Sequence, residues 1–411
     1  MSDNLSMQAV IVQAQQLFAE RFGAQGDTHI GWAPGRVNLI GEYTDLNQGY
    51  VLPMAIDQGI CVVLRLREKP GLSIYAHAFE AEATIRLPGE PANEQVVQAS
   101  AEPDWSTFVL GVAQLCRRAG CALQGFDAVI HGNLSRAGGV SSSAALTTAI
   151  SMAIQSATGH WLEPLANAQL CQRVEHDYMG VMCGLMDQMA CRMGRSQQAL
   201  FVDCLTNEST DIPFPMVQAH VLIVNSGVSR TLYSSEYNAR REECAQAIAA
   251  IQKLGYEIDS LREVGDEMLP SISSALGALG GLDAKLARRA HHVISENARV
   301  LQAKEALAAG GLPNFGQLMF ASHASLRDDF EVSVPQLDTI VAVAQASPGV
   351  LGARLTGAGF GGNAIVLVEP AHSAEVSQRI QAHFLDNFGV SPHTHLVGAA
   401  NPAKGCHSSA I

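Results

Sequence analysis

The sequence predicts a globular protein of about two domains that contains both strands and helices. Its 411 residues exceed what one compact core usually holds. Hydrophobic residues make up 47% of the chain and charged residues 16%, which excludes a low-hydrophobicity disordered chain and a coiled coil. Strand-like runs and segments of helical period follow one another along the sequence, so we expect both kinds of element.

The first half of the chain predicts a helix, then a sheet with loops, then a second helix. Residues 7–22 carry apolar side chains at three-to-four spacing and predict an amphipathic helix that ends by Gly23. Between residues 30 and 87, short β-rich runs alternate with Gly, Pro and polar clusters. Residues 126–134 predict a further strand, which leads into a Gly/Ser loop and a helix of small residues that ends near Gly159.

A domain crossing is expected near residue 212. Two apolar strands, 199–204 and 220–226, flank the turn-rich stretch TNESTDIPFP. We therefore divide the chain into domains of residues 1–212 and 213–411.

The second domain predicts long helices followed by a strand, a loop and a strand. Residues 235–254 and 282–309 have helical period. Residues 350–369, VLGARLTGAGFGGNAIVLVE, read as two strands joined by a Gly-rich loop.

Charge and cysteine content narrow the class of protein. Lys and Arg total 26 against 39 Asp and Glu, a net charge of −13, and a field of that sign repels a phosphodiester backbone. We therefore expect neither nucleic acid nor anionic membrane as a partner.

The nine cysteines are odd in number and scattered without a C-x-x-C pair, which predicts buried free thiols rather than a disulfide framework or a zinc ribbon. The N-terminal residues lack a signal-peptide pattern and no run approaches about 20 apolar residues, so we expect a cytoplasmic protein.

A Gly/Ser loop between a strand and a helix predicts a phosphate site. Glycines let the backbone wrap closely around an anion, and the helix that follows directs unpaired amide groups at it. The chain contains no Gly-Lys dipeptide, so this is not a Walker A loop. A serine-capped core helix is the structural alternative. The residues of the loop are Gly138, Gly139, Val140, Ser141, Ser142, Ser143 and Ala144.

A second Gly-rich run, residues 357–362, matches G-x-G-x-x-G by letter. A dinucleotide-binding loop opens a helix, whereas NAIVLV follows here and is strand-like, so the context excludes that interpretation. A tight turn whose backbone approaches a ligand or the other domain fits better, and a purely structural turn remains the alternative.

A third segment, residues 33–45, concentrates charged side chains among apolar ones. Arg36, Glu42 and Asp45 stand between Gly and Pro residues, and buried charges of this kind need partners or a ligand. Carboxylates can accept hydrogen bonds from sugar hydroxyls, and a guanidinium can contact the charge of a phosphoryl group. A salt bridge at the end of a strand is the alternative.

Together these segments resemble the galactokinases of the GHMP family of small-molecule kinases. GRVNLIGEYTDLNQGYVLPMAID resembles the sugar-kinase signature, GGVSSSAAL the phosphate loop and LTGAGFGG the third motif. The similarity covers residues from about 8 to 400 in consistent order. It implies an α+β fold of two domains, an N-terminal S5-like α/β domain and a C-terminal ferredoxin-like domain, with ATP bound between them.

The resemblance also implies roles for single residues. Asp187, from the MDQ segment, would face the anomeric hydroxyl beside Arg36, either as a base or as an orienting group. Trp105 would lie near adenine, and Mg²⁺ would be held by Ser142 and Glu175, with Ser141 a close substitute for Ser142. Taken alone, Glu175 would be a helix-surface acid and Trp105 a core residue. The implied sugar contacts are Glu42, Tyr43, Asp45, Gly184 and Tyr237.

The sequence departs from the family motif GEHTDY at two positions. Tyr43 stands in place of His and Leu46 in place of Tyr.

The expected function is ATP-dependent phosphorylation of the C1 hydroxyl of α-D-galactose by a monomer or weak homodimer. The alternatives are a C1 kinase for N-acetylgalactosamine, a C6-modified galactose or arabinose, and a galactose and ATP sensor without turnover.

Overall fold

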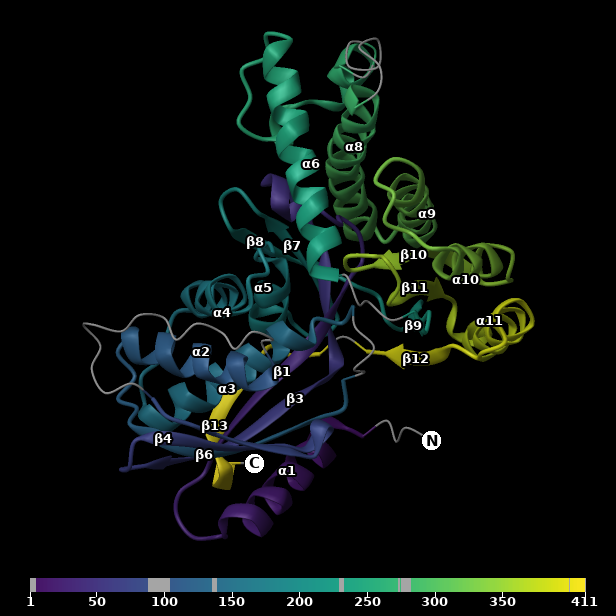
Figure 1. Cartoon of the computed structure of the whole chain (residues 1–411). Coiled ribbons are helices and arrows are strands. Elements are labelled where there is room, and N and C mark those ends of the chain that lie inside the picture. Colours follow the sequence, from purple (N-terminus) through teal and green to yellow (C-terminus); the bar gives the residue numbers. More distant parts are fainter. Residues whose placement is uncertain are drawn as a thin grey trace.

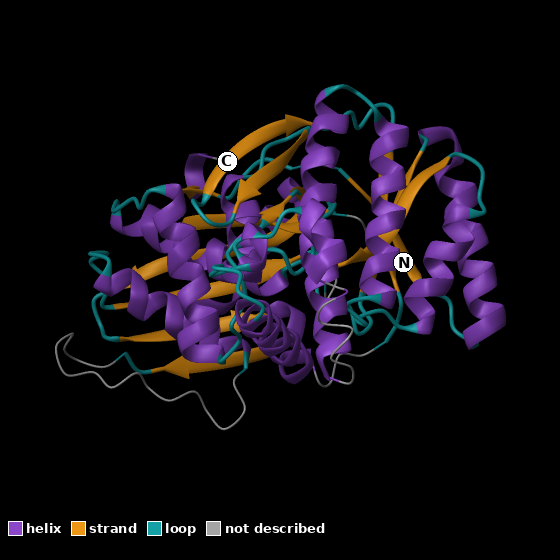
Figure 2. Cartoon of the chain, turned by 90° about the horizontal axis from the view of Figure 1, so that it is seen from above, coloured by secondary structure: helices purple, strands orange, loops and turns teal. Residues whose placement is uncertain are grey.

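The computed structural model describes residues 5–87, 104–134, 139–228, 233–272, 274, 282–398 and 400–410. It contains a large N-terminal sheet, a small sheet beside it and a C-terminal sheet, each covered by helices (Figures 1 and 2). The fold is of the α+β class that we expected.

The N-terminal half is built on a six-stranded sheet with the order β13-β1-β3-β6-β4-β5. Neighbouring strands are antiparallel except β4 and β6, which are parallel. The strands are β1 (His29–Asn38), β3 (Pro53–Arg67), β4 (Gly71–Ala76), β5 (Ala81–Ile85), β6 (Gly125–Gly132) and β13 (Lys404–His407).

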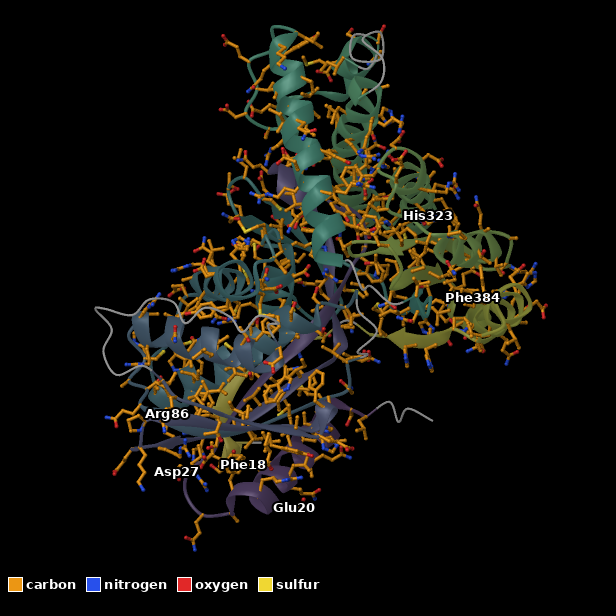
Figure 3. All side chains as sticks on the ribbon, in the orientation of Figure 1. Phe18, Glu20, Asp27, Arg86, His323 and Phe384 are labelled. Atoms are coloured by element: carbon orange, nitrogen blue, oxygen red, sulfur yellow. The ribbon has the colours of Figure 1, made fainter. Side chains whose placement is uncertain are left out.

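Helices cover both faces of this sheet. The predicted first helix is α1 (Met7–Phe22), and it ends at Gly23 as expected. Its buried residues pack on one face, where Figure 3 shows Phe18 turned to the sheet and Glu20 turned away. The other face carries α2 (Trp105–Arg118) and α3 (Ser142–Thr158) (Figure 1). A Cβ at Gly31 of β1 would overlap the backbone of Ala149, so β1 and the small-residue helix α3 pack backbone against backbone.

A three-stranded antiparallel sheet, β2-β7-β8, lies beside α4 (Pro164–Met179) and α5 (Met186–Met193). Its strands are β2 (Tyr50–Val51), β7 (Gln198–Asp203) and β8 (Glu208–Pro213). We expected the stretch that holds β8 to be turn-rich, and that expectation is wrong because residues Glu208–Pro213 form a strand; the domain crossing placed here stays a prediction. β8 pairs with β7 along its whole length, but most of its residues are polar and at least partly exposed, so its sequence resembles a loop.

The C-terminal half contains a four-stranded antiparallel sheet, β10-β11-β9-β12. In chain order its neighbours are the second, third, first and fourth strands, the arrangement of a ferredoxin-like domain. The strands are β9 (His220–Asn225), β10 (Val350–Thr356), β11 (Asn363–Val368) and β12 (His393–Val397).

Several longer helices accompany the C-terminal sheet in the part of the chain that the structure describes. They are α6 (Tyr233–Lys253), α8 (Leu282–Ala308), α9 (Leu312–Asp328), α10 (Pro335–Gln345) and α11 (Ser373–Phe388). α6 and α8 project together beyond the rest of the molecule, whereas α9 to α11 lie along the sheet (Figure 1). Short 3₁₀ turns occur at Asp45–Asn47, His77–Phe79, Leu261–Glu263, Asp266–Met268, Pro370–His372 and Ser408–Ala410.

The two halves are joined by more than a linker. After β12 the chain crosses back, and β13 pairs with β1 of the N-terminal sheet, so the last residues leave the C-terminal domain to which we had assigned them (Figure 1). One hydrophobic core includes Ile40 and Met54 of the first half together with Val300, Phe315 and Ile365 of the second. Because β13 and this shared core join the two halves, the division into residues 1–212 and 213–411 stays a proposal about where the chain passes from one half to the other.

All nine cysteines are free, and six of them are buried. Among the described helices none is both long and apolar enough to cross a membrane.

Candidate active site

The Gly/Ser loop, the Gly-rich run at residues 357–362 and the charged segment at residues 33–45 meet at the junction of the two halves. The amide of Arg36, near the end of β1, donates to the carbonyl of Val140 at 3.1 Å. The amide of Gly357, directly after β10, donates to the Glu42 carboxylate at 2.8 Å. A Cβ at Gly357 would lie 3.4 Å from the Cα of Gly139, so the third motif lies directly against the phosphate loop.

Asp187 and Arg36 form an ion pair at this junction. The guanidinium contacts Asp187 Oδ1 through Nε at 2.7 Å and through Nη2 at 2.5 Å. Asp187 lies in the first turn of α5, and Ser141 donates to its other oxygen, Oδ2, at 2.5 Å. The segments that implied a sugar site and a phosphate site therefore meet on one carboxylate.

Arg36 is a buried, permanently charged donor. Its side chain is 5% exposed, against 26% for Asp187. Burial works to lower the pKa of Arg36, but the charges of Asp187 and Glu42 outweigh it and raise the pKa above its usual value. Nη1 also donates to the carbonyl of Gly139 at 2.8 Å, which fixes the guanidinium between Asp187 and the loop.

A cavity of about 40 Å³ lies against the ion pair. We call it the polar cavity. The predicted sugar-contact residues all line it, together with Cys183, Met186, Gly357 and Ala358: they are Glu42, Tyr43, Asp45, Gly184 and Tyr237.

Asp45 and Gly184 form one wall of the polar cavity. Burial, and then the charge of Asp187, raise the pKa of Asp45 to about 7. A Cβ at Gly184 would overlap the Asp45 carboxylate, so only glycine leaves this carboxylate in place.

Glu42 is held by several donors. Asn38 Nδ2 donates to its Oε2 at 2.9 Å, the Gly357 amide donates to its Oε1, and the Arg354 guanidinium forms an ion pair with Oε2. Glu42 thus faces the polar cavity while the C-terminal half fixes its orientation.

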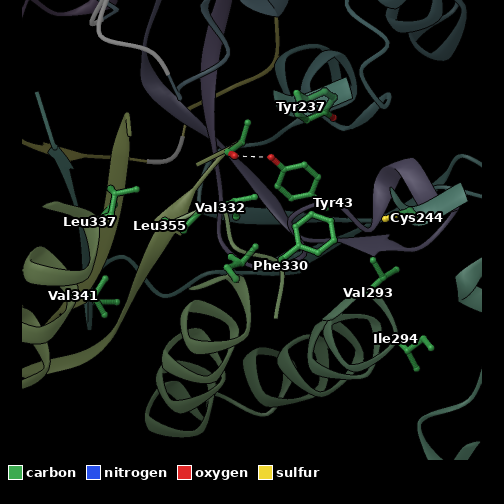
Figure 4. Close-up of a cluster of buried hydrophobic side chains, with 14 of the residues drawn as sticks. Tyr43, Tyr237, Cys244, Val293, Ile294, Phe330, Val332, Leu337, Val341 and Leu355 are labelled. Atoms are coloured by element: carbon green, nitrogen blue, oxygen red, sulfur yellow. Dashed lines mark hydrogen bonds between the residues drawn. The ribbon is translucent and has the colours of Figure 1, made fainter. Parts of the chain in front are cut away.

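Tyr43 contributes a ring to the site and directs its hydroxyl at the other half. The hydroxyl donates to the carbonyl of Ala358 at 2.6 Å, the dashed line in Figure 4. The ring packs between Phe330 and Tyr237, with centroids 4.6 and 5.4 Å away. Leu46, the other departure from the family motif, lines a neighbouring cavity of about 260 Å³ that shares Asp45 and Gly184 with the polar cavity.

A second, larger cavity lies on the other side of the phosphate loop residues. Its volume is about 360 Å³, it is lined mainly by apolar side chains, and we call it the aromatic cavity. Trp105 and Phe79 stack at its edge with ring centroids 6.2 Å apart and planes 11° from parallel. Ser142 and Ser143, at the start of α3, also line it. A flat base can lie in such a cavity while its phosphates reach the helix N-terminus.

The backbone of the phosphate loop is shaped for close approach. Gly139 and Ser141 have positive φ angles of 94° and 55°, and Ser141 is the N-cap residue of α3. Val140 and Ala144 are buried and anchor the loop in the core. Gly138 lies outside the described residues.

Glu175 lies behind the loop and is suited to a hard cation. Its Oε1 accepts hydrogen bonds from Ser143 at 3.0 Å and from Gln188 at 3.1 Å. Burial, and then the charge of Asp187, raise the pKa of Glu175 to about 7. Mg²⁺ prefers carboxylate and hydroxyl oxygens as ligands, and a cation would stabilise the buried charge of Glu175. The Glu175 carboxylate and the serine hydroxyls at the start of α3 therefore fit the ion.

Sequence reasoning missed three residues of the site. Gln188 follows Asp187 in the quoted MDQ segment, and its hydrogen bond orients Glu175. Arg354 directly precedes the third motif, LTGAGFGG, and Glu296 belongs to the stretch SENARV at residues 295–300. All three lie inside segments that resemble the family, but nothing in their spacing indicated a contact with the first motif.

Known proteins match both the sequence and this geometry. The family model for the galactokinase galactose-binding signature matches residues 16–66. The models for the GHMP kinases N terminal domain and the GHMP kinases C terminal domain match residues 107–195 and 303–386. Human galactokinase is 39% identical over 395 residues, which is 96% of each chain. The chain belongs to the galactokinase family of GHMP kinases.

Other family members agree. Galactokinase from Chloroflexus aurantiacus is 40% identical over 354 residues, covering 86% of this chain and 87% of that protein. The crystal structure of Lactococcus lactis galactokinase complexed with galactose is 34% identical, with a TM-score of 0.87 over 95% of this chain and 98% of that one. Mevalonate kinase from Methanococcus jannaschii, at 18% identity and a TM-score of 0.65, shares the fold over 90% of this chain and 98% of its own. Membership of the galactokinase family makes this chain a sugar kinase.

Proposed function

We propose that the chain transfers the γ-phosphoryl group of ATP to the C1 hydroxyl of α-D-galactose, giving galactose 1-phosphate and ADP. The observation that carries the proposal is the Arg36–Asp187 pair, which Ser141 of the phosphate loop also contacts. The Arg36–Asp187 pair lines the polar cavity and contacts the phosphate loop, and Ser142 and Ser143 of that loop line the aromatic cavity.

The proposed chemistry needs few groups. Asp187 accepts the proton of the C1 hydroxyl as the bond from that oxygen to the γ-phosphorus forms and the bond from this phosphorus to ADP breaks. Arg36, buried and already charged, stabilises the negative charge that develops on the transferred group. Asp45, Glu42 and the backbone at Gly184 hold the sugar by its other hydroxyls.

Mg²⁺ is the cofactor that we propose beside ATP. Ser142 and Glu175 would hold it, and Ser143 and Gln188 keep the Glu175 carboxylate turned toward the loop. When bound, the ion neutralises charge on the triphosphate, which the loop cannot do with a lysine because it contains none.

We further infer a cytoplasmic monomer or weak homodimer. Nine free thiols fit a reducing compartment, where free cysteines persist. Sedimentation at several protein concentrations tests the oligomeric state.

A panel of free sugars with MgATP tests the substrate. ADP release is followed with galactose, N-acetylgalactosamine, 6-deoxygalactose, arabinose and glucose, and the position of the phosphate is read by NMR. We expect the highest kcat/KM with galactose. A kcat/KM for galactose about tenfold below that of another sugar would reject galactose as the substrate. Nucleotide binding without ADP release from any sugar would instead indicate a sensor.

The second candidate, a kinase for a related sugar, is favoured by one observation. Tyr43 lines the polar cavity, but its hydroxyl is directed to Ala358. Tyr43→His restores the family residue, and it should lower the KM for galactose if this position limits galactose binding. An unchanged KM would show that position 43 does not set specificity.

A further inference from the structure

Arg354 is one of the most deeply buried charges in the described chain, and it does not line the polar cavity. Its side chain is 0% exposed, and it lies on β10 in the C-terminal half. Nη2 pairs with Glu42 Oε2, Nη1 donates to the carbonyl of Asn38 at 3.1 Å, and Nε donates to Ser322 Oγ at 3.2 Å. It therefore joins the first motif to the C-terminal helices.

The Arg354 guanidinium offsets part of the cost of burying the Glu42 carboxylate. Its side chain is 2% exposed, and burial raises its pKa above the usual carboxyl range, although Arg354 opposes that rise. Arg36, the other cation nearby, is bound to Asp187 through two nitrogens and to the carbonyl of Gly139 through the third. Within the described residues, Arg354 is thus the cation that forms an ion pair with Glu42.

Arg354 is itself held in one position. Ser322 donates to Glu296 Oε1 at 2.5 Å as well as accepting from Arg354, and Glu296 lies 3.9 Å from Arg354 Nη2. Arg299 and the amide of Gly41 donate to Glu296 at 2.6 and 2.9 Å. A buried ion pair stabilises little by itself, but a fixed pair gives one orientation to the group that it holds.

We propose that Arg354 is a positioning residue for the sugar: it keeps Glu42 turned so that the carboxylate accepts a hydrogen bond from a sugar hydroxyl in the polar cavity. The inference rests on the proposed function. A protonated or rotated Glu42 would present a donor, or nothing, to the same hydroxyl. Because the proposal places Glu42 on a sugar hydroxyl other than the one that is phosphorylated, its contact counts equally in the ground state and the transition state, so KM for the sugar should change and kcat should not.

Arg354→Lys tests this against a matched control. Lysine keeps the charge but lacks the planar fork that reaches Glu42, Asn38 and Ser322 together. Arg289→Lys is the control, because Arg289 is equally buried, pairs with Glu243 and Glu331, and lines neither the polar nor the aromatic cavity. We expect Arg354→Lys to raise KM for galactose about tenfold or more, the scale of losing one hydrogen bond to a charged group. KM for ATP and kcat should stay within about threefold, and Arg289→Lys should lower Tm without changing KM for galactose. Equal sugar KM values in the two variants would overturn the proposal.

A double variant keeps the test valid if a single change unfolds the protein. Glu42→Gln/Arg354→Met removes both charges together, which is far less costly than leaving one buried charge unpaired. We expect its Tm to exceed that of Arg354→Met while its KM for galactose stays raised. A wild-type KM for galactose in the folded double variant would show that the pair only stabilises the fold.

If the unchanged protein forms no galactose 1-phosphate, the proposed function fails. If it forms galactose 1-phosphate and the variants have the same KM for galactose as the unchanged protein, only this inference fails.

Discussion

Replacing Asp187 by Asn should abolish most of the turnover while leaving the cavities in place. The carboxylate accepts two contacts from Arg36 on Oδ1 and one from Ser141 on Oδ2. Asn retains one oxygen for Arg36, but its amide cannot accept from Ser141 or take a proton. Loss of a positioned proton acceptor costs roughly 10² to 10⁴ in rate, so we expect kcat to fall by at least about 10², or ~2.7 kcal/mol.

The same change removes the counter-charge of a buried guanidinium, so stability must be measured beside activity. Breaking a fully buried pair costs about 3–5 kcal/mol. Because Asp187 is 26% exposed and Arg36 keeps the carbonyl of Gly139, the loss should be smaller.

Asp203→Asn is the matched control for this loss of stability. It breaks the Asp203–Arg262 pair, whose side chains are 19% and 15% exposed, and it lies outside both cavities. ADP release at saturating galactose and MgATP, with Tm recorded for both variants, separates the effects. Turnover of Asp187→Asn within about threefold of the unchanged protein would refute the reasoning.

Three further predictions address the sugar, the nucleotide and the proton balance. Gly184→Ala should displace the Asp45 carboxylate and raise KM for galactose about tenfold with little change in KM for ATP; initial-rate kinetics with each substrate varied check this. Trp105→Ala should weaken ATP binding about tenfold, the scale of losing one stacked base, and leave the sugar KM unchanged, as titration calorimetry would show. Burial, and then the charge of Asp187, raise the pKa of both Asp45 and Glu175 to about 7, so between about pH 4 and 7 these two carboxyls bind more protons in the folded protein than in the unfolded chain. Their contribution to the free energy of unfolding without ligands should therefore fall as pH rises through that window. Urea titrations of the unchanged protein and of Asp45→Asn isolate the Asp45 part, and a difference between the two proteins that grows with pH would contradict it.

Elements with strong local patterns could be predicted from the sequence. The first helix has a clear apolar face and a terminal glycine, and it ends where we expected, at Gly23. β8 could not be recognised because a polar edge strand has no apolar alternation, and only its pairing with β7 makes it a strand. β13 is four residues long, and its partner β1 lies more than 360 residues earlier in the chain, a distance that no local pattern spans.

The site shows the same limit. Residue types alone indicated an anion loop at residues 138–144 and a charged segment at residues 33–45, but whether either bound a ligand stayed open. Arg36 and Asp187 are 151 positions apart, so their ion pair was expected only through the family resemblance. The contact of Arg354 with Glu42 depends on how the two halves pack, and the hydroxyl of Tyr43 has its acceptor, Ala358, 315 positions away. Side-chain roles that depend on packing between distant segments need coordinates.

A crystal structure with galactose and a non-hydrolysable ATP analogue tests the central claim most directly. We predict that the C1 hydroxyl lies about 2.6–3.2 Å from the Asp187 carboxylate, with the terminal phosphorus beyond it and within reach of Arg36. A sugar bound with C1 turned toward Asp45, or a nucleotide whose terminal phosphate lies away from the Arg36–Asp187 pair, would contradict the proposed reaction.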